Sequence, residues 1–85
     1  MDIASIEKFL VTNKEKFNVF NIHFKDRSPV TGIFVSAKDH SELKAKNFWR
    51  FVNLKNLQQW KATKDINLSR LFNGASFTRL SGAVE

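Results

Sequence analysis

The 85-residue chain has no cysteine, a single proline and three glycines that are isolated from one another. Without cysteine it can form neither a disulfide framework nor a thiolate metal site, which suits a reducing cytosol. Isolated glycines do not form a phosphate-cradling loop. No apolar run approaches the roughly 20 residues that a membrane-spanning helix needs. We therefore expect a cytoplasmic protein with no cofactor and no membrane association.

Acidic residues are also absent between Leu43 and Lys64. The other eight basic residues of the chain are balanced by its eight acids, so this segment accounts for the whole formal charge of +6. Its basic residues are Lys44, Lys46, Arg50, Lys55, Lys61 and Lys64. A local excess of this size is more than solubility requires, and it indicates RNA or another polyanion as a partner.

The sequence gives little support for catalysis. No serine has a nucleophile-elbow pattern around it. His23 and His40 are 17 residues apart and have no cysteine nearby, which matches no metal-site spacing. We therefore expect a protein that is not an enzyme and holds no metal.

Helical spacing is confined to the start of the chain, within residues 1–14. The apolar residues that recur on one helical face are Ile3, Ile6, Phe9 and Leu10. Asp2 is a good N-cap residue, because its carboxylate can accept from the free amides of the first turn. The pattern predicts an amphipathic helix that ends near Asn13.

From Phe17 onward the chain has the texture of a β-sheet. Phe20, Ile22 and Phe24 alternate with polar residues, as in a half-buried strand. Further strands are expected at 30–37, 48–52, 57–63 and 75–80. Gly32 predicts a bend or bulge in the second strand. Asp65 and Gly74 predict the two ends of a short helix. Residues 38–47 fit either a loop or a short helical turn.

This order of elements predicts one α+β domain over residues 1–85. The leading helix packs on a small, strongly bent five-stranded β-barrel formed by 17–80, and 81–85 is a tail. We expect the large apolar residues of these elements to be mostly buried in the core. They are Ile6, Phe9, Leu10, Phe20, Ile22, Phe24, Phe34, Phe51, Leu71, Phe72 and Phe77.

The stretch from Phe20 to Gly32 resembles the first motif of the Sm-like family, in particular its bacterial Hfq-type branch. An apolar strand meets a polar turn there, and the next strand has an apolar residue two places before a glycine. Gln59 to Ala62 resembles the aromatic-lysine pair of that branch's second motif, but its following histidine is absent. The short helix before the last strand is more similar to SH3-like barrels. The resemblance implies a small RNA-binding barrel.

Both tryptophans of the chain, Trp49 and Trp60, lie in the basic segment. Aromatic faces stack on unpaired bases, while cations contact phosphates. Alternation places Trp49 and Phe51 on one face of their strand, and whether Trp49 is core or a stacking platform stays open. Trp60 lies between Gln59 and Lys61, so we expect it to be partly exposed.

These features predict a non-catalytic nucleic-acid-binding module for single-stranded RNA. The predicted phosphate contacts are Lys44, Lys46, Lys61 and Lys64, and the predicted stacking residues are Trp60 and Trp49. Arg50 can serve in either role, because guanidinium groups both pair with phosphate and stack on bases. The alternative is a protein-interaction or self-associating module with no nucleic-acid role, in which Trp49, Arg50 and Trp60 are interface anchors and strand edges pair between copies.

Overall fold

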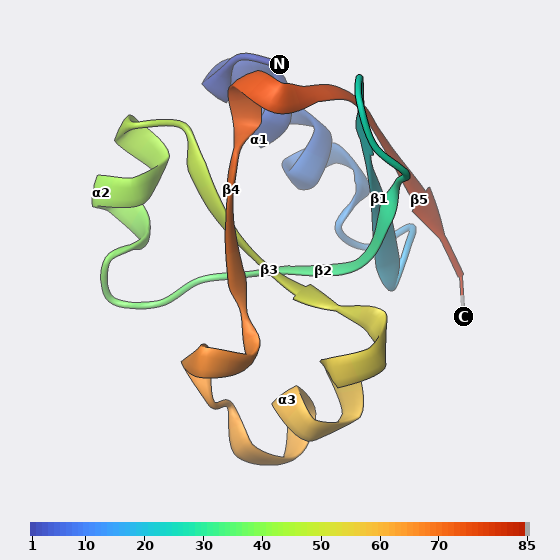
Figure 1. Cartoon of the computed structure of the whole chain (residues 1–85), viewed down its shortest axis with the longest axis vertical. Helices are drawn as coiled ribbons and strands as arrows, with labels where there is room; N and C mark the ends of the chain where they lie inside the picture. Colours follow the sequence, from blue (N-terminus) through green and yellow to red (C-terminus); the bar gives the residue numbers. More distant parts are fainter. Residues whose placement is uncertain (85) are drawn as a thin grey trace.

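The computed structural model describes residues 1–84. It has an α+β architecture with an antiparallel five-stranded sheet of order β4-β3-β2-β1-β5 (Figure 1). In chain order the elements are α1 (Ile3–Asn13), β1 (Val19–Phe24), β2 (Val30–Val35), α2 (His40–Ala45), β3 (Phe48–Asn53), η1 (Leu54–Asn56), α3 (Leu57–Thr63), η2 (Ile66–Leu68), β4 (Arg70–Asn73), η3 (Gly74–Ser76) and β5 (Phe77–Ala83). No helix among these is both long and apolar enough to cross a membrane.

The first helix begins and ends as its sequence predicts. The Asp2 carboxylate accepts from the Ser5 backbone N–H at 2.8 Å and caps α1. Ile6 is fully buried, and Phe9 and Leu10 pack partly buried against the same core. The apolar stripe of α1 therefore covers the sheet.

The sheet turns a corner at Gly32. Residues 30–32 pair with β1, whereas residues 32–35 pair with β3, so Gly32 is the one residue that pairs with both neighbours. Figure 1 shows β2 curving sharply between these two partners. The bend predicted at this glycine is confirmed, while the register irregularity of the sheet lies between His23 and Phe24.

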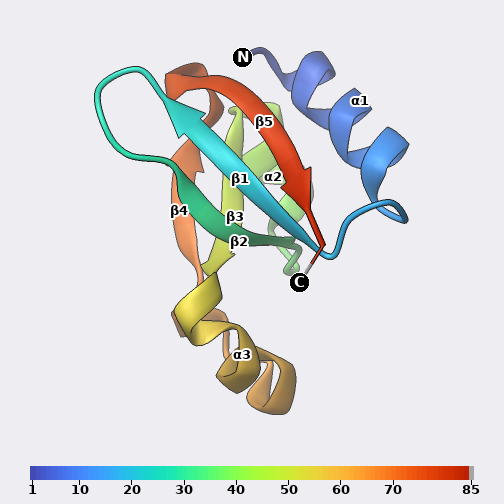
Figure 2. The same ribbon diagram turned by 90° about the vertical axis from the view of Figure 1, so that its right-hand side faces the viewer.

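The bent sheet separates two clusters of buried side chains. The inner cluster lies under α1 and contains Ile6, Phe20, Ile22, Trp49, Phe51, Phe77 and Leu80. The second contains Val19, Val52, Leu57 and Trp60, and it packs α3 against the opposite face. Figure 2 shows α1 beside β1 and β5, with α3 beyond the far end of the sheet. The helices therefore cover different faces.

The strand predicted at 57–63 is wrong, because these residues form α3. Leu57 and Trp60 lie three residues apart and are both buried, which a helix achieves by placing them on one face. Residues 38–47, left open by the sequence, contain α2.

The helix predicted between Asp65 and Gly74 is also wrong. The Asp65 carboxylate caps only the 3-10 turn η2, by accepting from Asn67 N–H at 3.0 Å, and β4 follows as a strand. Leu71 is 48% exposed on β4, so its assignment to the core is wrong.

The sheet is open, and the predicted barrel closure is not confirmed. Within the described residues, β4 pairs only with β3 and β5 pairs only with β1. Ser81 to Ala83 continue β5 along β1, so this part of the predicted tail is a strand, and Glu85 lies outside the described residues.

Candidate nucleic-acid interface

The basic segment is partly neutralised by acids from elsewhere in the chain. Lys44 of α2 forms an ion pair with Glu7 of α1. Arg50 of β3 pairs with Asp39, its Nη2 lying 2.7 Å from one carboxylate oxygen and its Nε 3.3 Å from the other. Two of the six cations that the sequence leaves unbalanced therefore have acidic partners in the fold.

The pairing with Arg50 lowers the pKa of Asp39 below its ordinary value of 3.8, chiefly through the hydrogen bonds from the guanidinium. The same contact raises the pKa of Arg50. A carboxyl group whose pKa is lower in the folded state stabilises that state above its unfolded pKa. This contribution is lost as the pH falls through the folded pKa.

Asp39→Asn is therefore expected to lower the melting temperature more at neutral pH than at a pH well below 3.8, because protonation of the native carboxyl weakens its pairing with Arg50. Thermal unfolding followed by circular dichroism at both pH values checks this expectation. Asp26→Asn is the control, because Asp26 is exposed and forms no ion pair within residues 1–84. An equal effect of Asp39→Asn at both pH values contradicts the pairing.

Both tryptophans are buried. Trp49 is 3% exposed, and its indole N–H donates to the Asn47 side-chain oxygen at 2.8 Å. Trp60 is 9% exposed, so the prediction that it is partly exposed is wrong. It packs with Val19, Val52 and Leu57. In this conformation neither ring offers an open face for a base.

The predicted site residues do not form one surface. Lys44, Trp49 and Arg50 line a groove between α1 and α2. Trp60 and Lys61 lie on α3, and Lys64 is its C-cap residue, with its ammonium group 5.6 Å from the Trp60 ring centroid. Figure 1 shows α2 at the upper left of the molecule and α3 at its bottom. The exposed Lys46 ends α2, far from α3.

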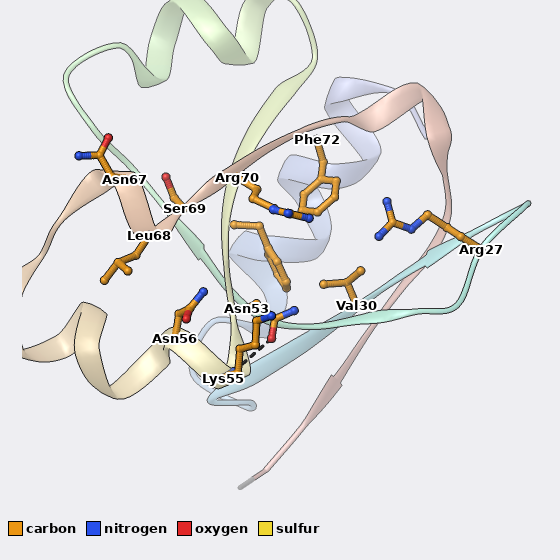
Figure 3. Close-up of a pocket in the computed structure, with 11 residues that line it drawn as sticks. Arg27, Val30, Asn53, Lys55, Asn56, Asn67, Leu68, Ser69, Arg70 and Phe72 are labelled. Carbon is orange, nitrogen blue, oxygen red and sulfur yellow. Dashed lines mark hydrogen bonds between the residues drawn. The ribbon is translucent and has the colours of Figure 1, made fainter.

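A different cluster of cations surrounds a pocket of about 230 Å³ (Figure 3). Its lining contains three basic residues, four polar residues, four apolar residues and no acid. They are Arg27, Val30, Phe51, Asn53, Lys55, Asn56, Asn67, Leu68, Ser69, Arg70 and Phe72. Figure 3 shows the Arg27 and Arg70 side chains extending toward each other across this space.

Strand alternation explains why this pocket forms. Phe51 belongs to the inner core and is paired with Arg70, so Arg70 projects to the same inner side of the sheet. Phe72 lies two residues further along β4 and shares this side. Arg27 comes from the β1–β2 connection, and Lys55 comes from η1 directly after β3. The pocket is therefore an opening of the bent sheet on its concave side.

The pocket cations have no acidic partner among residues 1–84. Arg27 is instead held by aromatic rings, with its guanidinium carbon 5.0 Å from the centroid of Phe24 and 5.9 Å from that of Phe72. The Asn53 side-chain oxygen accepts from Lys55 N–H at 3.1 Å, which leaves its amide NH₂ free to donate. This arrangement can bind an anionic group that has an apolar neighbour.

None of the seven site residues predicted from the sequence lines this pocket. Arg27, Lys55 and Arg70 lie far apart in the chain, and only the strand register brings them together.

Residues 1–84 hold no group of three His, Asp or Glu side chains able to bind a metal ion. No family model, curated protein or solved structure matches the chain.

Proposed function

We propose that the chain is a non-catalytic module that binds single-stranded nucleic acid, preferring RNA, at the pocket of Arg27, Lys55 and Arg70. The observation that carries the proposal is the clustering of three cations, without an acid, around a cavity with aromatic and amide walls. Phosphate contacts supply most of the affinity for a nucleic acid, and flat or apolar walls accept its sugars and bases.

A path for the strand leads from this pocket toward α3. Lys55 lines both the pocket and a neighbouring depression that also contains Lys61. Lys61 and Lys64 are exposed and form no ion pair within the described chain. These two lysines therefore remain proposed phosphate contacts. Phe72, and neither of the buried tryptophans, provides the aromatic wall.

The order of the elements also supports this proposal, although less specifically than the pocket does. An N-terminal helix followed by an open sheet of order β4-β3-β2-β1-β5, with a 3-10 turn between β4 and β5, is compatible with an unclosed small barrel of the Sm-like or SH3-like type. We infer the preference for RNA from the resemblance to the Sm-like family. A cytoplasmic location is part of the same proposal.

Replacing a pocket cation should weaken binding and reduce its salt dependence. For a single strand, each phosphate contact contributes about 0.7 to the slope of log K against log salt concentration. Arg27→Gln, Lys55→Gln and Arg70→Gln are each expected to flatten the slope by about this amount. Fluorescence anisotropy with one labelled oligonucleotide, as RNA and as DNA, over a series of salt concentrations measures it.

Lys8→Gln is the matched control for these variants. It removes the same charge from the exposed side of α1 and touches none of the cavities found in the described chain. The proposal requires the Lys8 variant to keep a slope close to that of the unmodified protein. Equal slopes for Lys8→Gln and Arg70→Gln would mean that only the overall charge matters and that the pocket is not the site.

The open edges of the sheet favour a second candidate function, self-association or binding of a protein strand. β4 and β5 each have one edge that no other strand of residues 1–84 pairs with, and Leu71 on β4 is half exposed. Such an interface responds little to salt. Sedimentation velocity that shows a salt-insensitive dimer, together with no binding of any oligonucleotide, favours this candidate.

A further inference from the structure

We propose that the pocket recognises a terminal phosphate of the nucleic acid, a phosphomonoester, rather than a phosphodiester within the strand. This inference rests on the proposed function and specifies which part of the nucleic acid occupies the pocket. Three cations and no acid line this pocket, whose volume is about 230 Å³.

The amount of charge favours a terminal phosphate. Each internal phosphodiester carries one negative charge, and a protein that follows a strand spreads its cations along a groove. A phosphomonoester carries about −1.5 to −2 at neutral pH and has three strongly accepting oxygens. Because Arg27, Lys55 and Arg70 repel one another across one small space, an anion of higher charge relieves more of that repulsion.

The donors around the cavity suit a group with several accepting oxygens. The two guanidinium groups are planar forks that can each bind two oxygens, and Lys55 adds a compact charge. Asn53 adds an amide NH₂ that is free because its oxygen already accepts from Lys55 N–H. The Asn56 and Asn67 side chains make no hydrogen bond within the described residues, so they remain available as neutral donors.

The size of the cavity sets a limit on what enters it. Pockets for whole small molecules usually start at about 300 Å³, so a cavity of about 230 Å³ accepts a group or a single unit of a chain. The Phe72 and Val30 side chains form an apolar wall suited to the sugar next to the phosphate. One end of a strand fits this description, because only its last unit has to enter.

The test compares three versions of one single-stranded RNA: with a 5′-phosphate, with a 3′-phosphate, and with hydroxyls at both ends. Binding is measured by anisotropy at fixed salt, with the label on the same internal base in all three RNAs, so that both ends stay unmodified. One phosphorylated form is expected to bind about tenfold more tightly than the hydroxyl form, the gain from one additional charge-assisted hydrogen bond. An unphosphorylated RNA one nucleotide longer controls for the added charge and should gain little.

Two readouts tie the preference to the pocket. Arg27→Gln and Arg70→Gln should remove it, whereas Lys8→Gln should keep it. The preference should also decrease between about pH 7.5 and 5.5, because the phosphomonoester takes up its second proton near pH 6. The charged groups lining the pocket are Arg27 from the β1–β2 connection, Lys55 from η1 and Arg70 from β4, and neither histidine is among them.

The outcomes separate this inference from the proposed function. Equal affinity for all three RNAs, with binding still salt-dependent and weakened by Arg70→Gln, would refute terminal recognition and leave nucleic-acid binding in place. If a phosphorylated RNA binds more tightly and keeps this preference in both Arg27→Gln and Arg70→Gln, then its terminal phosphate binds outside the pocket. This result would also refute the inference. Absence of binding to every RNA would refute both.

Discussion

Phe51→Ala is expected to lower the free energy of unfolding by about 3–5 kcal/mol, the usual cost of truncating a fully buried phenylalanine. Phe51 is 1% exposed and lies at the centre of the inner core. Its ring packs edge-on against Phe34, with centroids 5.0 Å apart, and against Phe72, with centroids 6.1 Å apart. Small domains have about 5–15 kcal/mol of total stability, so this loss is a large share.

Urea unfolding at 25 °C, followed by circular dichroism, measures the effect as a shift of the midpoint with an unchanged slope. Leu71→Ala is the matched control on the neighbouring strand: Leu71 is 48% exposed, and its truncation should be nearly neutral. Phe51→Leu keeps part of the buried surface and gives a measurable value if the alanine variant does not fold. Equal midpoints for Phe51→Ala and Leu71→Ala would show that the inner core is elsewhere.

Phe51 and Leu71 were both predicted to lie in the core, but only Phe51 is buried. Periodicity therefore predicts part of the fold. Where one face of an element is buried and the other is polar, the pattern specifies the element, as it does for α1 and for β1. The N-cap of α1 and the corner at Gly32 are also local properties, and both were predicted from the sequence. The α+β class follows from these parts.

The failure at α3 has a physical cause. Its sequence is rich in good helix formers, Gln, Lys and Ala, and Leu57 and Trp60 have the spacing of one helical face. The usual sign of a helix end is missing, because the C-cap position with left-handed φ (55°) is Lys64 rather than glycine. Reading Trp60 as part of a strand led to its predicted exposure, whereas the helix buries it.

The candidate site could not be predicted from the sequence for a different reason. Charge counting along the chain finds neighbours in sequence, but Lys44 and Arg50 are neutralised by Glu7 and Asp39, which lie outside the counted segment. Arg27 and Arg70 belong to the eight basic residues that are matched in number by the eight acids, and yet they meet around a cavity with no acid. Only the register that pairs Phe51 with Arg70 reveals this.

Gly32→Ala is the second substitution with a large expected effect. The glycine lies where β2 changes partners, and a Cβ atom built there collides with the backbone carbonyl of Val52 and lies 3.0 Å from the Phe51 ring. Overpacking a core usually costs about 1–3 kcal/mol. We expect about 3 kcal/mol or more for this site, because a carbonyl within the β2–β3 ladder has less freedom to move than a side chain.

Gly82→Ala is the matched control, since it makes the same chemical change on β5. A Cβ atom at Gly82 meets the ring of Phe17, a partly buried side chain before β1 that can move aside. Both variants gain about 0.4–1 kcal/mol from the reduced freedom of the unfolded chain, so this term cancels in their comparison. Urea midpoints are expected in the order unmodified protein, Gly82→Ala, Gly32→Ala, from highest to lowest. If Gly32→Ala is as stable as Gly82→Ala, then the β2–β3 backbones are not in close contact at this corner, and the bend has another origin.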